Sequence, residues 1–173
     1  MSVISLRWYW FGLLGSLALL AIAYYYFERH LGLPPCPLCM FQRAALVGVA
    51  FFCLLGLIIR PKMLVARLLA FFILLSSLFG LAVAGRQVWL QNLPADQVPE
   101  CGPDLGFMMD VFPFMQMVEM VLSGSGECAE VQWQFLWLTM PGWMLVIFAV
   151  MVLISVKLLF KRERNYFSGA LGR

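Results

Sequence analysis

Four long apolar stretches constrain the fold of this 173-residue chain more than any other feature, and they cover about residues 8–27, 40–59, 68–85 and 135–156. A helix needs about 20 mostly apolar residues to cross a bilayer, and backbone that faces lipid must form its hydrogen bonds internally. Only 12% of the residues are charged and 63% are hydrophobic, which is too apolar for a soluble domain. The sequence therefore predicts an all-α membrane protein, a four-transmembrane-helix bundle, with residues 1–173 in one integral membrane domain.

The distribution of charge predicts how these helices are oriented. The link between the second and third helices carries Arg60, Lys62 and Arg67 without any acid, and the C-terminal tail is also basic. The other two links, about residues 28–39 and 86–134, hold every acidic residue except Glu163. Because basic residues are retained on the cytoplasmic side, both termini and the middle link are expected in the cytoplasm. The two acidic links are expected on the outward side.

The second outward link contains one further apolar segment, residues 107–122. Asp110, Pro113 and Glu119 lie within it and argue against a full crossing of the membrane. We expect a short helix in the membrane interface, and a packed cover over the bundle is an equal alternative. Pro141 predicts a kink near the outer end of the fourth helix.

Four of the five cysteines fall on the predicted outward face, at Cys36, Cys39, Cys101 and Cys128. The outward side of a bacterial inner membrane is oxidising and permits disulfides. Spacing makes Cys36–Cys39 and Cys101–Cys128 the natural pairs, but four cysteines allow three connectivities and the sequence does not choose among them. Cys53 lies in the middle of the second helix, where a cysteine commonly acts as a small apolar residue.

Three interpretations of the outward cysteines compete. A structural disulfide gains most from closing a long loop, whereas Cys36-Pro37-Leu38-Cys39 closes almost nothing. Zinc needs four ligands held together, and one C-x-x-C is a weak signal for it, so no metal site is expected. A C-x-x-C is a common way to tune a reactive dithiol. The redox interpretation is therefore favoured.

The start of the second helix has features that would support such a dithiol. Pro37 suits the first helical position, which makes Cys36 the expected N-cap and puts Cys39 in the first turn. A helix N-terminus favours a thiolate there. Arg43 follows Cys39 by one turn on the same face, and it either stabilises a thiolate or reduced acceptor or extends toward the lipid headgroups.

Together these residues resemble the disulfide bond formation protein B (DsbB) family. The similarity covers nearly the whole chain and rests on the C-x-x-C with Gln42-Arg43, Cys101, Cys128, Glu127–Trp133 and Met140–Trp143. The resemblance implies an inner-membrane enzyme that reoxidises a periplasmic DsbA-type thiol oxidase and passes the electrons to quinone, either ubiquinone or menaquinone. The lipid bilayer is its setting, and no nucleic-acid partner is expected.

The resemblance also implies a role for each outward cysteine. Cys101 would be attacked by the partner's thiolate, Cys128 would be released to attack Cys36, and Cys39 would face the quinone beside Arg43. The redox-active disulfides would be Cys36–Cys39 and Cys101–Cys128. Gln87 aligns with a histidine that some members carry near the quinone, and glutamine donates a hydrogen bond but does not titrate.

Two other hypotheses stay open at this point. The chain could be a non-catalytic membrane scaffold with two structural disulfides, in which case replacing Cys36 or Cys39 would leave partner oxidation intact. It could also be a paralogue within the family that serves a dedicated partner.

Overall fold

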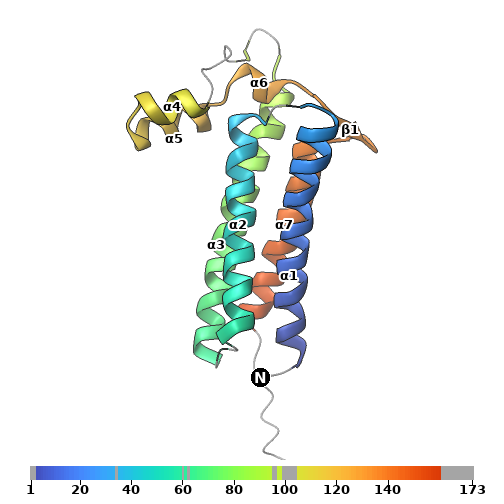
Figure 1. Cartoon of the computed structure of the whole chain (residues 1–173), viewed down its shortest axis with the longest axis vertical. Helices are drawn as coiled ribbons and strands as arrows, with labels where there is room; N and C mark the ends of the chain where they lie inside the picture. The colour runs from blue at the N-terminus through green and yellow to red at the C-terminus, as the bar shows by residue number, and fades with distance from the viewer. Residues whose placement is uncertain are drawn as a thin grey trace, which may run out of the picture.

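The computed structural model describes residues 3–33, 35–59, 61, 63–94, 97–98 and 105–160. The bundle contains α1 (Val3–Ala21) with its π-helical continuation η1 (Ile22–His30), α2 (Pro37–Ile59), α3 (Met63–Gln91) and α7 (Met140–Leu159) (Figure 1). Four helical spans, one from each of these elements, are long and apolar enough to cross a membrane. The predicted four-helix bundle of a multi-pass membrane protein is confirmed. The inclusion of the whole chain in one domain stays a prediction.

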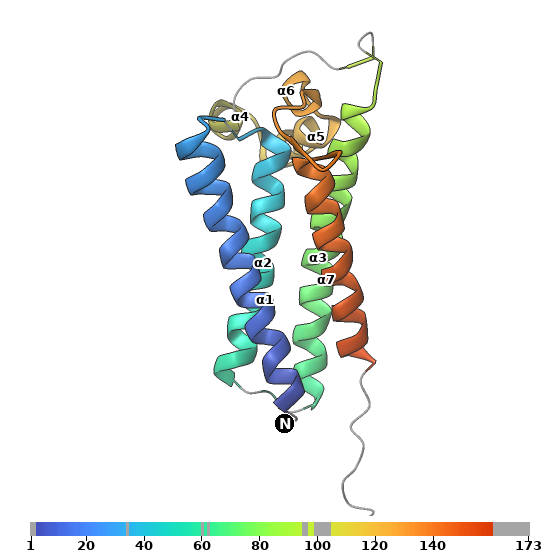
Figure 2. The same cartoon turned by 90° about the vertical axis from the view of Figure 1, so that its right-hand side faces the viewer.

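The four helices run side by side for most of their length (Figure 2). Helix α3 packs against both α2 and α7, while α1 packs mainly against α2. Glycine allows one of these close approaches, because a Cβ atom at Gly80 of α3 would lie 2.3 Å from the ring of Phe148 on α7. Small residues at helix interfaces bring transmembrane helices together in this way.

The observed helix bounds differ from the predicted ones at the outward end. Helix α3 continues to Gln91, so Gln87 lies on a helix and not in the link, and α2 already begins at Pro37. Helix α7 begins at Met140, because the preceding residues form a hairpin of β1 (Gln134–Phe135) and β2 (Leu138–Thr139). Pro141 therefore lies in the first turn of α7, where a missing N–H breaks no helical bond, and the predicted kink is wrong.

The second outward link forms three short helices at the end of the bundle. Helices α4 (Leu105–Val111) and α5 (Phe114–Ser123) project to one side of it, and α6 (Gly126–Ala129) lies over the ends of the long helices (Figure 1). Pro113 separates α4 from α5, since it lacks the N–H that a continuous helix needs. The residues of α5 fit both predicted roles of this segment. Met117 and Val121 are buried, as in a packed cover over the bundle, whereas Phe114 and Met115 are exposed, as in a helix of the membrane interface.

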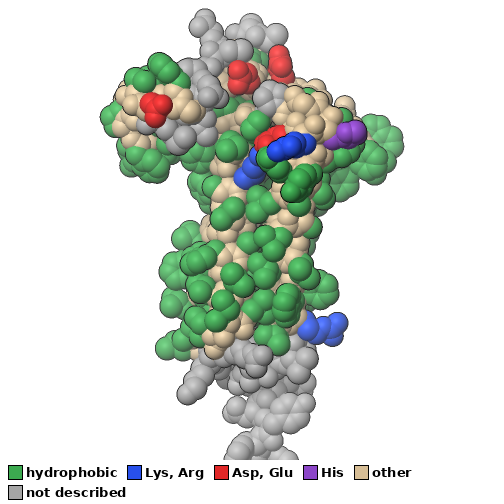
Figure 3. All heavy atoms as spheres, in the orientation of Figure 1, with side chains coloured by type: hydrophobic (Ala, Val, Ile, Leu, Met, Phe, Trp, Pro, Cys, Tyr) green, Lys and Arg blue, Asp and Glu red, His purple; other side chains and the backbone are tan. Residues whose placement is uncertain are grey.

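Charged side chains gather at this same end of the molecule. On the face drawn in Figure 3, hydrophobic side chains cover most of the length of the bundle, every acidic group lies at the end that carries α4, α5 and α6, and a basic group is also seen near the opposite end. The polar chemistry of the described chain is therefore concentrated where the outward links meet the helices. Cys101, one of the predicted site residues, lies outside the described residues.

Candidate active site

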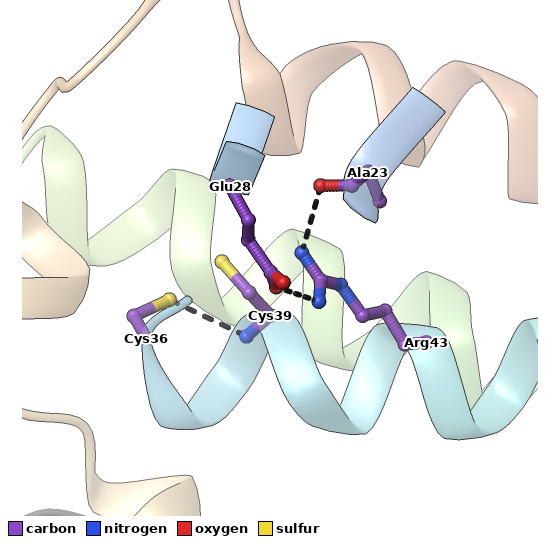
Figure 4. Close-up of polar contacts among 5 residues, drawn as sticks. All are labelled: Ala23, Glu28, Cys36, Cys39 and Arg43. Carbon is purple, nitrogen blue, oxygen red and sulfur yellow. Dashed lines mark hydrogen bonds and ion pairs between the residues drawn. The ribbon is translucent and has the colours of Figure 1, made fainter. Parts of the chain in front are cut away.

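Cys36 and Cys39 are positioned by the start of α2. The backbone N–H of Cys39 donates to the Cys36 sulfur over 3.3 Å, and the N–H of Met40 donates to the Cys36 carbonyl over 3.2 Å (Figure 4). Cys36 thus caps the helix with its sulfur, and the predicted N-cap is confirmed. A sulfur held against free backbone N–H groups at a helix N-terminus is in a setting that stabilises negative charge.

Cys128 reaches the same place from the second outward link. It is fully buried on α6, its N–H donates to the Ser125 carbonyl over 2.9 Å, and its sulfur lies 3.5 Å from the Ser125 hydroxyl oxygen. It belongs to the same buried cluster as Cys36, and the interaction of the two thiols shifts their pKa values. The fold therefore brings together three of the four predicted cysteines, Cys36, Cys39 and Cys128, from separate segments of the chain.

The interaction between Cys36 and Cys128 shifts the pKa values of the two thiols in opposite directions. Donation from the Cys36 thiol lowers the pKa of Cys128 to about 6, with a further contribution from Ser125 and against the effect of burial. The same bond to Cys128, with one to Cys39 and burial, raises the pKa of Cys36. A thiolate is the attacking species in disulfide exchange, and the lowered pKa makes Cys128 the sulfur of this pair that ionises more readily.

The described cysteines are all free thiols, namely Cys36, Cys39, Cys53 and Cys128. Both predicted disulfides, Cys36–Cys39 and Cys101–Cys128, stay predictions.

Gln87 lies directly against the dithiol. Its Nε2 is 3.3 Å from the Cys36 sulfur and 3.4 Å from the Cys39 sulfur, and its Oε1 accepts a hydrogen bond of 2.7 Å from Gln42 Nε2. Both glutamines are buried. The sequence suggested Gln87 as a quinone contact, and it treated Gln42 only as part of the motif. The structure places Gln87 between Gln42 and the two sulfurs.

Arg43 extends from α2 to the first membrane helix. Its guanidinium forms an ion pair with Glu28, and Nη2 lies 3.4 Å from the Ala23 carbonyl (Figure 4). Glu28 and Ala23 both belong to the π-helix η1, an irregularity that occurs frequently at functional sites. The alternative of an arginine that only extends toward headgroups is therefore not what the structure shows.

Glu28 is the polar residue of this site that the sequence reasoning missed. Its carboxylate and the Arg43 guanidinium are both only partly exposed. The available signal was an arginine inside an apolar stretch, because such a charge commonly has a partner near the same membrane depth. Glu28 is an acid at the outward end of a neighbouring apolar stretch and fits that requirement.

An apolar cavity of about 330 Å³ opens beside these polar groups. Cys39, Gln42, Arg43 and Gln87 line it on one side. Phe27, Trp133, Phe135 and Trp143 contribute aromatic walls, with Phe27 and Trp133 edge-to-face at 5.2 Å and Trp143 Nε1 donating to the Phe135 carbonyl over 3.1 Å. Within the described chain, Cys39 faces this cavity, whereas Cys36 and Cys128 do not line it.

Cys53 and the single histidine of the chain, His30, lie away from this cluster. Cys53 is buried in the middle of the bundle among apolar side chains such as Leu13, Val49 and Ile73, in agreement with its predicted role as a small apolar residue. His30 is exposed at the end of η1, with its ring 5.9 Å from that of Tyr26. Among the described residues, no group of three His, Cys, Asp or Glu side chains could hold a metal ion.

The family model described as disulfide bond formation protein DsbB matches residues 5–158. A protein of Marinobacter nauticus named disulfide bond formation protein B is 42% identical over 158 residues, 90% of this chain and 93% of the relative. Proteins of the same name are 46% identical in Nitrosococcus oceani, over 88% of this chain and 90% of the relative, and 49% identical in Hahella chejuensis, over 72% and 75%. The chain therefore belongs to the disulfide bond formation protein DsbB family.

Proposed function

We propose that the chain is a protein-dithiol:quinone oxidoreductase that sustains disulfide bond formation in the periplasm. It would reoxidise a DsbA-type thiol oxidase and pass the electrons to ubiquinone or menaquinone in the bacterial inner membrane. The observation that carries the proposal is the position of Cys36 and Cys39, with Cys128 against one sulfur and an apolar cavity beside the other. Membership of the DsbB family supports it independently.

The exchange of disulfides begins at the second outward link. A thiolate of the partner attacks Cys101 in the Cys101–Cys128 disulfide, which forms a mixed disulfide and releases Cys128 as a thiolate. The second thiol of the partner, as its thiolate, then displaces Cys101, so the partner leaves oxidised. The contact between Cys128 and Cys36 and the lowered pKa of Cys128, about 6, support the released sulfur as the next nucleophile.

The second exchange transfers the reducing equivalents to the membrane side. Cys128 attacks Cys36 in the Cys36–Cys39 disulfide, forms a Cys36–Cys128 disulfide and releases Cys39 as a thiolate. The Cys101 thiolate then attacks Cys128, which restores the Cys101–Cys128 disulfide and releases Cys36. The reduced Cys36–Cys39 pair then holds the two electrons that a bound quinone would accept as the Cys36–Cys39 disulfide re-forms. Cys39 is the sulfur that lines the cavity, and Gln87 N–H groups lie beside both members of the pair. In the whole cycle the two partner thiols lose two electrons and two protons, and the quinone gains the same number.

The cavity has the size and lining that a quinone ring requires. Its volume of about 330 Å³ lies at the lower end of the range for ligand pockets, and most of its lining residues are apolar or aromatic. Arg43 would hold a quinone oxygen or the charge that develops on it, since a guanidinium is a strong donor to anionic oxygen. A bound quinone would supply a two-electron, two-proton acceptor at this position.

The proposed orientation puts both termini in the cytoplasm and the cysteine cluster on the periplasmic side. The basic link between α2 and α3 and the acidic outward links support this orientation. It brings Cys101 and Cys128 to a soluble partner and opens the cavity at the depth where a lipid-soluble acceptor is found.

A two-reporter assay tests the proposal. Purified protein is mixed with a reduced DsbA-type partner and ubiquinone, and partner thiols and quinone absorbance are followed together, with menaquinone in a parallel sample. We expect one quinone to be reduced for each partner disulfide formed. Partner oxidation that does not depend on quinone, or none at all, would sink the proposal.

The same assay separates the two rival hypotheses. A scaffold with structural disulfides would show equal partner oxidation in the wild type and in Cys39→Ser. A paralogue with a dedicated partner would reduce quinone with that partner and fail with a general DsbA-type protein.

A further inference from the structure

We propose that Gln42 is a positioning residue that orients the side-chain amide of Gln87 so that its N–H groups face the Cys36 and Cys39 sulfurs. The inference rests on the proposed redox function of this dithiol and adds a residue that controls it. Gln42 lies on α2 between the C-x-x-C and Arg43, and Gln87 lies on the facing side of α3.

The two side-chain amides are joined by a hydrogen bond in which Gln42 is the donor and Gln87 the acceptor. Gln42 Nε2 donates to Gln87 Oε1 over 2.7 Å, and Gln87 Nε2 lies 3.3 Å and 3.4 Å from the two sulfurs. The side chains of Gln42 and Gln87 are 4% and 3% exposed, so water does not readily replace these partners. A buried amide carries an acceptor on one side and donors on the other. Fixing the oxygen of Gln87 on Gln42 therefore turns its nitrogen to the cysteines.

The orientation matters because the two redox states of the dithiol differ as acceptors. A thiolate accepts a strong, charge-assisted hydrogen bond, whereas a disulfide sulfur accepts only a weak one. Donation by Gln87 thus stabilises the reduced pair more than the disulfide. The Cys39 sulfur also lies 3.8 Å from Gln87 Oε1. A neutral Cys39 thiol can donate a hydrogen bond to this oxygen, whereas a thiolate cannot. A reversed amide would instead point its oxygen at the sulfurs and disfavour the thiolate.

The Gln42–Gln87 hydrogen bond would therefore raise the reduction potential of the Cys36–Cys39 pair, although neither glutamine titrates. Hydrogen bonds to sulfur are one of the ways in which a protein raises the potential of a sulfur centre. With its amide so oriented, Gln87 makes the Cys36–Cys39 disulfide a better acceptor of electrons from Cys128. Gln42 acts only through Gln87, although it also lines the cavity.

A redox titration of the full chain tests the inference without partner or quinone. The purified protein is equilibrated with mixtures of oxidised and reduced dithiothreitol, quenched in acid, alkylated and digested with trypsin. Cleavage after Arg29 and Arg43 releases residues 30–43 as one peptide that contains both cysteines. Its mass distinguishes the dialkylated dithiol from the Cys36–Cys39 disulfide, and a Cys36–Cys128 link gives a separate cross-linked peptide.

Three variants make the measurement specific. Gln42→Met keeps the side-chain length and removes the donor, and we expect the dithiol–disulfide equilibrium to shift toward the disulfide by about tenfold, the size of one hydrogen bond to a charged group. This corresponds to about 30 mV for a two-electron couple. Gln42→Glu, whose carboxylate draws the Gln87 N–H away from sulfur, should shift it at least as far in the same direction at pH 8. Gln87→Met removes the N–H donor to the two sulfurs itself, and its shift gives the largest change in the dithiol–disulfide equilibrium that Gln42 could cause through Gln87.

A matched control excludes general damage to the bundle. Ser77→Ala removes a buried hydroxyl of α3 that donates to the Ile73 carbonyl over 2.8 Å, on the same helix as Gln87 but almost three turns before it, and it should leave the equilibrium within about twofold of the wild type. A shift in Gln87→Met with none in Gln42→Met would overturn the positioning role of Gln42. If Gln42→Met does not fold, Gln42→Glu decides on the same criterion. Failure of quinone reduction with an intact shift would instead contradict the proposed function alone.

Discussion

Two cysteines of helix α2 and its N-cap, Cys36 and Cys53, are equally buried but have different neighbours. Cys36 at its N-terminal end and Cys53 in its middle are 5% and 3% exposed. Cys36 contacts a backbone N–H, the Gln87 amide and Cys128, whereas Cys53 is surrounded by apolar side chains. Burial therefore does not mark the reactive thiol in this helix. The hydrogen-bond donors around Cys36 distinguish it from Cys53.

The largest expected effect contrasts Cys39 with Cys53. Cys39→Ser should reduce quinone-dependent oxidation of the partner by about a thousandfold or more, because it removes a sulfur that reacts in every cycle. Cys53→Ala should leave the rate within about twofold, since Cys53 only fills space between helices. The measurement is steady-state quinone reduction at saturating partner. Equal losses of rate in the two variants would contradict the assignment of a redox role to Cys39 and a packing role to Cys53.

The second prediction concerns the donor that Cys36 supplies to Cys128. In the reduced protein, Cys128 should alkylate with a midpoint near pH 6, its lowered pKa, so that reactivity is retained at neutral pH and lost as the pH falls below that value. Cys36→Ala removes the donor, and the midpoint should rise toward the ordinary value of 9.0.

The readout is the rate of iodoacetamide modification of the peptide that contains Cys128, followed by mass spectrometry from pH 5 to 10. Cys53→Ala serves as the control and should keep the wild-type midpoint. A Cys128 midpoint near 9 in the wild type would contradict the proposed polarisation of the thiol pair.

Arg43 gives a third, smaller effect on the cavity side of the dithiol. Arg43→His should lower kcat/KM for quinone by roughly 10- to 100-fold, the range for loss of a hydrogen bond to a charged group. The rate at which the partner forms a mixed disulfide should stay unchanged, since Arg43 lines the cavity and does not contact Cys128. Stopped-flow measurement of the two half-reactions separates these effects, and equal losses in both would refute the assigned role.

Glu28 is expected to give the smallest change. Glu28→Gln keeps an acceptor for Arg43 but removes its charge, so kcat/KM for quinone should change only about 2- to 5-fold, as for a partly exposed ion pair. Because the loss acts through Arg43, the double variant with Arg43→His should be little worse than Arg43→His alone. Additive losses would show that Glu28 has a separate function.

The sequence predicted the helices well because membrane crossing requires long apolar runs that are visible without tertiary information. It also predicted the sulfur cap, since Pro37 after Cys36 is a local signal. The links between helices were less predictable. Leu136 and Trp137 adopt positive φ values of 49° and 63° in the turn of the hairpin, a conformation usually supplied by glycine or asparagine, so no sequence signal marked this hairpin.

The polar pairs of the site could not be predicted for a different reason. Gln42–Gln87 and Arg43–Glu28 each join two helices, and their formation depends on how those helices rotate against one another. Apolar periodicity is weak when a helix is hydrophobic on all sides, as membrane helices are. The sequence therefore indicated which residues were chemically suitable, and the packing of α1, α2 and α3 determined which of them meet.

The spacing of Cys36 and Cys39 within one helical turn has a kinetic consequence. In the proposed cycle, a protein partner working through Cys128 would approach Cys36 and an acceptor in the cavity would approach Cys39, so neither substrate would have to wait for the other to bind. The two half-reactions would then be independent in time. Initial rates measured at several concentrations of both substrates should give parallel double-reciprocal lines, the pattern of a ping-pong enzyme.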